Sequence, residues 1–160
     1  MAEARNSDAM ARSREHAATG VLARRSRYLL LAVAIVLTAG ALGQFFLAGL
    51  SVFETPRYWS NHATFGSVLG LVANVAWVPA ILGRVGWRLV VGSLLLPVLF
   101  TAQHALVAID QSFVQALHPL NGACLFALSL GIAVRTAALV RRGSAAPASV
   151  RRRAGSGTPI

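Results

Sequence analysis

Lysine is absent from this 160-residue chain, and acidic residues and cysteine are scarce. Five Asp and Glu side chains are too few for the charged surface of a soluble domain of this size. The single cysteine, Cys124, excludes an intramolecular disulfide. Phosphate-binding loops, hydrolase triads, paired catalytic acids and haem-attaching thiol motifs are missing as well, so no residue is predicted to be catalytic. Instead, 56% of the residues are hydrophobic and the mean hydropathy is +0.62, which indicates an integral membrane protein.

Four apolar runs are long enough to cross a bilayer, because about 20 helical residues span a hydrocarbon core of about 30 Å. Short polar connections between them force successive helices to run antiparallel. We therefore predict an all-α, up-down-up-down four-helix transmembrane bundle over residues 28–142. A partly disordered basic tail is expected at 1–27 and a disordered tail at 143–160. The predicted spans are 28–50, 62–82, 89–109 and 119–140.

The arginines predict the orientation of this bundle. Every arginine except Arg57 falls on the side that holds both termini and the 83–88 loop. Because cytoplasmic segments retain positive charge, we expect a multi-pass protein of the bacterial inner (cytoplasmic) membrane with both termini cytoplasmic. Topology thus explains the formal net charge of +10. The expected partner is the lipid bilayer and not nucleic acid, since the basic residues flank membrane spans instead of forming one folded surface.

Two short phrases carry the functional signal. His62 with Gly66, and His118 with Gly122, each place a histidine and a glycine one helical turn apart near the outer end of a span. The second and fourth spans stand diagonally opposite, so the two imidazoles are expected at one depth. Histidine is costly in a membrane and tends to mark a site, while glycine lets a flat group or another helix approach the backbone. We predict that His62 and His118 are metal ligands that hold the iron of haem b near the outer leaflet.

Further residues complete the predicted cofactor-binding set. His104 is expected in the same outer half of the bundle, and Gly70 extends the small-residue stripe that starts at Gly66. Gln44 precedes His62 as Gln103 precedes His118, which indicates a faint internal repeat of two helical hairpins. The expected roles are electron transfer or haem handling, with a membrane protein as electron-transfer partner. The complete set is His62, His118, His104, Gly66, Gly70, Gly122, Gln44 and Gln103.

Helix-capping patterns bear on the same two histidines. Asn61 is expected to cap the second helix, and Pro119 suits the first turn of the fourth. Both histidines would then lie at helix N-termini, where the helix dipole favours a neutral imidazole.

Two other interpretations stay open. In one, the protein is a non-catalytic accessory or scaffold without a cofactor, and its glycines mediate helix packing. In the other, the outer face holds a different site. A copper or zinc ion would add Glu54 or Asp110 to the histidines, whereas a quinone pocket or transport pathway would use His104, Gln103 and Asn74.

Several strings resemble an uncharacterised family of small four-helix bacterial membrane proteins without an assigned function. They are the segment 46–53 (FLAGLSVF), Trp59 with His62 and Gly66, Gln103, and the segment 116–122 (ALHPLNG). The resemblance covers residues 28–142. The bundle is also loosely similar to four-helix haem-b membrane cytochromes and to haem A synthase, in which histidines on facing helices hold haem. The glutamate-to-histidine signature of that synthase is absent, so the resemblance does not imply synthase activity.

Overall fold

The computed structural model describes the backbone of residues 2–154, and the side chains of residue 10 and of residues 15–143. Five helices make up this part of the chain, and short turns connect them. A single residue, Ala76, separates the second helix from the third, so these two form one continuous span. The helices are α1 (Ala2–Phe53), α2 (Tyr58–Val75), α3 (Trp77–Leu82), α4 (Trp87–Ala108) and α5 (Ser112–Ala154).

Four segments of the described chain are long and apolar enough to cross a membrane. The predicted all-α fold with four transmembrane helices is therefore confirmed. The helices extend beyond the predicted apolar runs. The polar sequence that flanks these runs contains alanine and arginine, and both residue types favour helix. Residue 1 and residues 155–160 of the expected tails lie outside the described part. The four segments are Glu15–Phe53, Tyr58–Leu82, Trp87–Ala108 and Ser112–Gly143.

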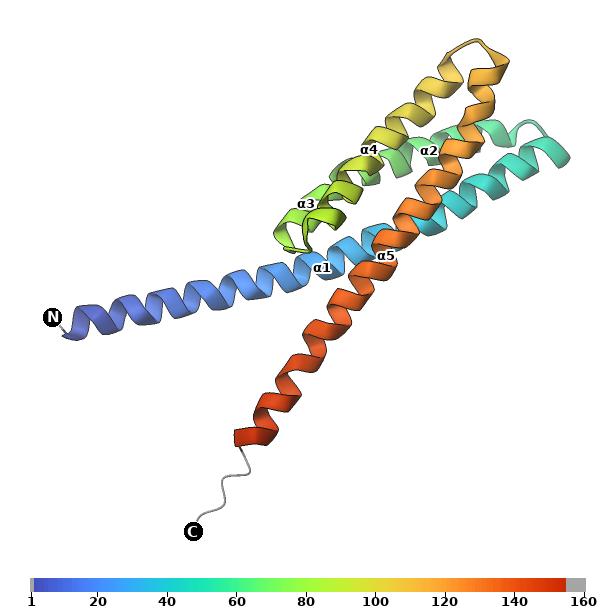
Figure 1. Cartoon of the computed structure of the whole chain (residues 1–160). Coiled ribbons are helices and arrows are strands. Elements are labelled where there is room, and N and C mark those ends of the chain that lie inside the picture. Colours follow the sequence, from blue (N-terminus) through green and yellow to red (C-terminus); the bar gives the residue numbers. More distant parts are fainter. Residues whose placement is uncertain (1, 155–160) are drawn as a thin grey trace.

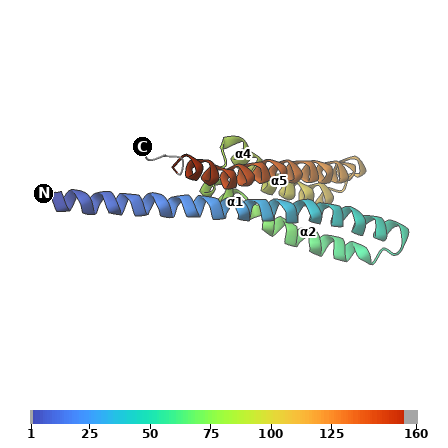
Figure 2. The ribbon, with the colours of Figure 1, turned by 90° about the horizontal axis from the view of Figure 1, so that it is seen from below.

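The helices pack in the order expected for an up-down-up-down bundle. α1 packs against α5 and against the α2–α3 span, and α4 contacts the same two neighbours. Within the described residues α2 and α5 share no backbone contact, so they occupy diagonal positions. The α1–α2 and α4–α5 turns lie at one end of the bundle (Figure 1). α1 and α5 run side by side and cross (Figures 1 and 2).

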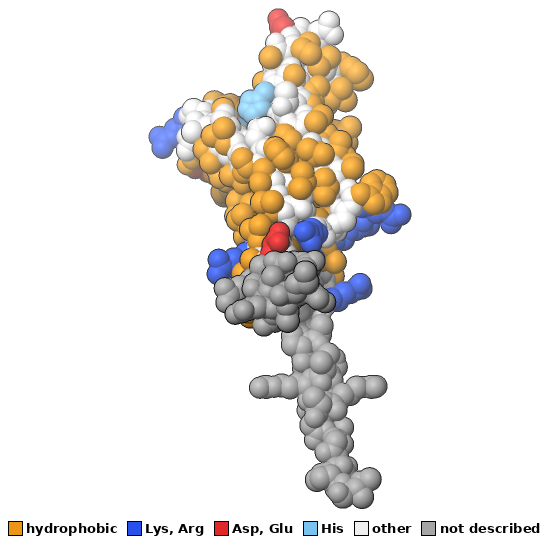
Figure 3. All heavy atoms as spheres, turned by 90° about the vertical axis from the view of Figure 1, so that its left-hand side faces the viewer, with side chains coloured by type: hydrophobic (Ala, Val, Ile, Leu, Met, Phe, Trp, Pro, Cys, Tyr) orange, Lys and Arg blue, Asp and Glu red, His pale blue; other side chains and the backbone are white. Residues whose placement is uncertain are grey.

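The core lies between the helices, at the level of the crossing. Leu30 and Leu37 of α1 and Leu96 of α4 are almost fully buried, and small alanines let the α2–α3 span approach them. Outside the core, large apolar side chains such as Leu71, which is 72% exposed, cover the surface. Figure 3 shows this apolar surface, with arginines gathered beside the undescribed residues. Such a surface is expected for a protein whose solvent is lipid.

Polar contacts fasten the bundle at two further levels. Thr38 Oγ1 of α1, which donates to the Ala34 carbonyl oxygen over 2.7 Å, also lies 3.1 Å from Ser129 Oγ of α5, and this polar contact links the two crossing helices. Toward the arginine-rich end, Arg27 Nε donates to the Gly83 carbonyl oxygen over 2.8 Å. That bond ties α1 to the α3–α4 turn, where Gly86 adopts a φ of +94°. The turn therefore depends on glycine, because side chains strongly disfavour this conformation.

The predicted helix starts at Asn61 and Pro119 are wrong. α2 begins at Tyr58 with Arg57 in the capping position, so Asn61 lies inside the first turn. α5 begins at Ser112, which places Pro119 and His118 more than one turn inside the helix. The run Ser-Phe-Val-Gln-Ala-Leu continues the helix upstream of the proline. Proline has a φ that suits a helix, and near the start of a helix its missing N–H removes few backbone hydrogen bonds. The dipole of α5 therefore acts weakly on His118, since its effect fades beyond the first turn.

Candidate functional site

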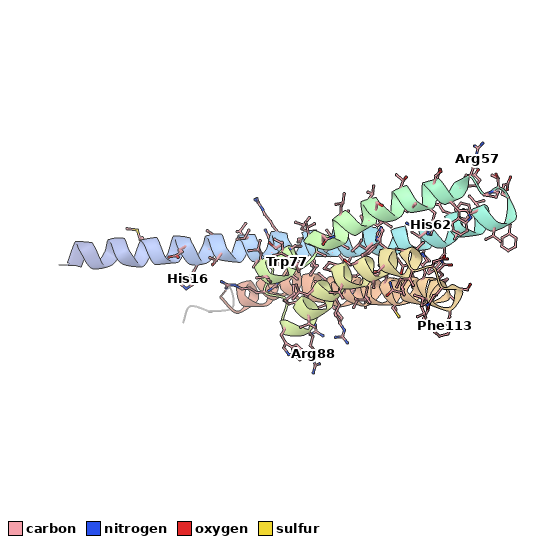
Figure 4. The ribbon with its side chains drawn as sticks, turned by 90° about the horizontal axis from the view of Figure 1, so that it is seen from above. His16, Arg57, His62, Trp77, Arg88 and Phe113 are labelled. Atoms are coloured by element: carbon pink, nitrogen blue, oxygen red, sulfur yellow. The ribbon has the colours of Figure 1, made fainter. Side chains whose placement is uncertain are left out.

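His62 of α2 and His118 of α5 meet across the diagonal of the bundle. Their ring centroids are 6.0 Å apart and their planes are inclined at 52°. Both side chains are half-buried. Figure 4 shows His62 at the end of the bundle where α1 turns into α2, far from His16 on the outlying part of α1. Two helices without backbone contact thus bring their imidazoles together.

A glutamine of the preceding helix holds His62 in place. Gln44 Nε2 of α1 donates to the His62 carbonyl oxygen over 3.0 Å, and His62 Nδ1 donates to the Gln44 carbonyl oxygen over 3.1 Å. The edge of Trp59, one turn earlier in α2, packs against the same ring with centroids 5.6 Å apart. The sequence signal for this contact is the spacing of three residues between Trp59 and His62, which places both on one helix face.

The second hairpin repeats this arrangement. Gln103 Nε2 of α4 donates to the His118 carbonyl oxygen over 3.0 Å, and His118 Nδ1 donates to the Gln103 carbonyl oxygen, also over 3.0 Å. The repeat expected from sequence is therefore present as two reciprocal glutamine–histidine pairs, one in each hairpin. A carbonyl oxygen only accepts, so each Nδ1 carries its hydrogen. In a neutral imidazole this leaves the lone pair on Nε2.

The two glycines make room for the glutamines. A Cβ at Gly66 would lie 2.7 Å from Gln44 Nε2, and one at Gly122 would lie 3.4 Å from Gln103 Nε2. The amide group of a glutamine thus fills the space beside each glycine. The same amide donates to the carbonyl oxygen of the histidine one helical turn earlier in the chain.

The two pairs differ in what satisfies the glutamine oxygen. Asn121 Nδ2 donates to Gln103 Oε1, and also to the Leu99 carbonyl oxygen over 2.9 Å. In the first hairpin the corresponding residue is Phe65, and Gln44 Oε1 is buried without a hydrogen-bond partner. The first pair therefore contains an acceptor that has lost its contact with water, which is costly in a low-dielectric interior.

His104 has a place of its own, in a groove between α2 and α4. Its Nδ1 donates to the Phe100 carbonyl oxygen of the same helix over 2.9 Å. Gly70 lies on the opposite wall, where an added Cβ would be 3.9 Å from His104 Cε1. The structure thus brings two of the three predicted outer histidines together and directs the third into the groove.

Acidic residues do not join the histidine pair. Among the residues whose side chains are described, no three His, Cys, Asp or Glu side chains gather closely enough to hold a metal ion. Neither Glu54 nor Asp110 therefore forms such a group with the two histidines in the described structure, and the copper or zinc site stays a prediction. Glu54 lies in the α1–α2 turn and Asp110 in the α4–α5 turn, outside the helices that carry the two histidines.

Comparison with known proteins gives one similarity. Residues 44–109 match the model of DUF6220, a family of unknown function. The matched segment starts at Gln44, continues through α2, α3 and α4, and ends before His118. It therefore contains the first glutamine–histidine pair and half of the second. No curated protein and no solved structure matches the chain. The chain is a polytopic membrane protein, and its function has to be inferred from the site.

Proposed function

We propose that the histidine pair binds haem b, and that His62 and His118 would hold its iron. The observation that carries this proposal is the state of the two rings. Each Nδ1 is committed to a backbone carbonyl, each Nε2 keeps its lone pair, and the ring centroids are 6.0 Å apart. Histidines that bind metals usually donate their other ring nitrogen in this way, which fixes the tautomer and the ring orientation.

The spacing of the two rings is close to that of two imidazoles bound to one metal ion. Two imidazoles bound to one metal through bonds of about 2.0 Å, in line with each other, have ring centroids roughly 6 Å apart. The observed 6.0 Å agrees with this value. Because α2 and α5 stand diagonally opposite without backbone contact, the two imidazoles come from facing helices, the arrangement from which helix bundles build cofactor sites.

The number of protein ligands favours haem over a bare metal ion. Structural zinc requires four protein ligands and catalytic zinc three. Within the described part of the chain the histidine pair has no third His, Cys, Asp or Glu neighbour. Porphyrin iron needs only two axial ligands, since the macrocycle supplies the other four. Two imidazoles are thus a complete protein contribution for haem and an incomplete one for zinc.

Bound haem would supply one-electron redox chemistry. In that state His62 and His118 hold the iron, while Gln44 and Gln103 orient the two imidazoles. The site lies at the end of the bundle opposite the arginine-rich end. With the arginines in the cytoplasm, both termini are cytoplasmic and haem lies near the outer leaflet of the bacterial inner membrane. Electron transfer with a membrane protein, or haem handling, fits this position.

An absorbance spectrum tests the proposal. The full chain is expressed with ample haem and purified in detergent, and its reduced-minus-oxidised spectrum is recorded. We expect Soret and α bands from one haem per chain. His62→Ala and His118→Ala should each abolish these bands, whereas the control His16→Ala should keep them. A wild-type sample without bands would overturn the proposal.

A second candidate function is a scaffold without a cofactor. The reciprocal glutamine–histidine bonds favour it, because they fasten each hairpin without a ligand. In that case the wild-type protein has no haem bands, and His62→Ala lowers only the stability of the bundle. Stability and spectrum measured on the same samples therefore separate the two functions.

A further inference from the structure

A groove of about 170 Å³ opens between α2 and α4. It lies within two membrane-spanning segments, so a molecule dissolved in the lipid reaches it from the side. Its polar lining is unusual for a surface that faces lipid, where an exposed polar group is costly. The residues that matter here are Ser67, Gly70, Asn74, Phe100, Thr101 and His104.

On the α4 wall, the hydrogen-bond donors are already used. His104 Nδ1 donates to the Phe100 carbonyl oxygen over 2.9 Å, so a neutral ring has its lone pair on Nε2. Thr101 Oγ1 donates its only hydrogen to the Pro97 carbonyl oxygen over 2.9 Å. That carbonyl lies within one turn of the threonine, so the bond stays inside the helix. The α4 wall therefore offers acceptors.

The α2 wall has the same character. Ser67 Oγ donates to the Ala63 carbonyl oxygen over 3.0 Å, and Asn74 Nδ2 donates to the Gly70 carbonyl oxygen over 2.9 Å. Asn74 keeps one N–H, but its Oδ1 and the serine oxygen are acceptors. Of the four polar side chains that line the groove, only Asn74 thus has a donor left. The groove is built to receive hydroxyl or N–H groups.

The internal repeat indicates that this polarity is specific to one side of the bundle. Counted from the two glutamines, His104 corresponds to Phe45. The Phe45 ring lies against α5, 3.5 Å from a Cβ added at Gly122, and is 42% exposed. On the α2–α4 side an imidazole and a groove occur in place of that aromatic ring. The repeat thus places an apolar ring at this position in one half and a polar ring beside a groove in the other.

We propose that the groove binds a lipid-soluble hydroquinone, whose phenolic O–H donates to His104 Nε2. A cavity of about 150 Å³ is large enough for one benzene ring, so a single substituted ring fits the volume. Phe100 offers an aromatic surface for the ring, and the opening toward lipid leaves a path for an apolar tail. Hydroquinone is favoured over the oxidised quinone because the oxygens of a quinone can only accept hydrogen bonds. The polar side chains of the groove also offer mainly acceptors, so they match the O–H donors of the hydroquinone. This site does not depend on haem.

Direct binding measurements test the proposal. The full chain in nanodiscs is equilibrated, without oxygen, with decyl-substituted benzohydroquinone or with the corresponding quinone, and empty nanodiscs of the same lipid give the background. The protein is reduced beforehand for the first probe and oxidised for the second, so that no electron is exchanged. We expect saturable binding of one hydroquinone per chain, at least about fivefold tighter than binding of the quinone, as expected for one hydrogen bond.

Variants locate the binding. His104→Leu should weaken hydroquinone binding about fivefold, and His104→Gln, which restores an acceptor, should recover part of the loss. Thr101→Val should weaken it as well, while Thr38→Val, the same exchange at the α1–α5 contact, should leave it unchanged. His62→Ala should also keep the binding, so that failure of this proposal and failure of the haem proposal are distinguishable.

Three results would overturn the hydroquinone site. The first is binding no greater than that of empty nanodiscs, which would mean that only lipid occupies the groove. The second is equal or tighter binding of the quinone, which would contradict the argument from the acceptors. The third is hydroquinone binding to His104→Leu that is as tight as binding to the wild-type protein, which would show that the probe binds outside the groove.

Discussion

Alanine at Gly66 and alanine at Gly122 should have different effects, although the two glycines are equivalent in the repeat. A Cβ at Gly66 would lie 2.7 Å from Gln44 Nε2, closer than real Cβ atoms come to other heavy atoms. The glutamine amide must therefore move. It is the end of a flexible side chain and can do so, but it then loses its 3.0 Å bond to the His62 carbonyl oxygen. At Gly122 the corresponding distance of 3.4 Å is an ordinary contact.

The size of the difference follows from the bond that is lost. Replacing glycine by alanine removes a helix-propensity penalty of about 1 kcal/mol at both positions, and this gain cancels when the two variants are compared. Hydrogen bonds between membrane helices contribute about 0.6 kcal/mol on average and about 1.7 at most. We expect Gly66→Ala to be less stable than Gly122→Ala by about 1 to 2 kcal/mol, or roughly five- to thirtyfold in the unfolding equilibrium.

The assay is reversible unfolding of the purified chain in mixed micelles, in which the denaturing detergent fraction is raised and helix content is followed. Two double variants isolate the cause. In the Gln44→Ala background, Gly66→Ala should lose most of its destabilising effect, because the amide with which the new Cβ clashes is gone. In the Gln103→Ala background, Gly66→Ala should destabilise the protein as before. Equal stabilities of the two glycine variants would refute the account of the glycines as space for the glutamine amides.

Three further changes test the packing in the same assay. Gly83→Ala should destabilise the bundle by about 1 to 3 kcal/mol, because its Cβ would lie 2.7 Å from the Pro79 carbonyl oxygen, a backbone atom that cannot step aside. Gly131→Ala, with no other atom within 4 Å, should be neutral or slightly stabilising. Leu96→Ala should cost about 2 kcal/mol through its cavity, while exposed Leu71→Ala should cost almost nothing; equal costs would contradict the assigned core.

The architecture was predictable because it depends on properties that one sequence contains. Apolar length predicts the spans, and short connections predict antiparallel neighbours and hence the diagonal pairing of the second and fourth spans. The depth of His62 and His118 follows from these two facts alone. The spacing of Gln44 and Gln103 ahead of the histidines also indicated the repeat, so sequence periodicity carried even part of the site.

The remaining details depend on contacts between helices, which a single sequence does not specify. Nothing in the spacing of Gly66 shows whether a ligand, another helix or a glutamine side chain fills the space beside it. The helix starts were predicted too far along the chain, because the residues just before Asn61 and Pro119 also fold into helix. His104 was expected in the same outer half of the bundle as the pair, but its side chain lies in the groove between α2 and α4 instead.

The differences between the two halves are as informative as their likeness. Both halves keep the glutamine, the histidine and the glycine, which are the residues needed to present two equivalent imidazoles. They differ at Phe65 against Asn121 and at Phe45 against His104. None of these four residues forms a glutamine–histidine bond itself, although Asn121 satisfies the Gln103 oxygen and Phe65 leaves the Gln44 oxygen without a partner. The repeat thus preserves the two imidazoles of the histidine pair in equivalent positions. Outside the pair its halves differ, and the polar groove lies on the side between α2 and α4.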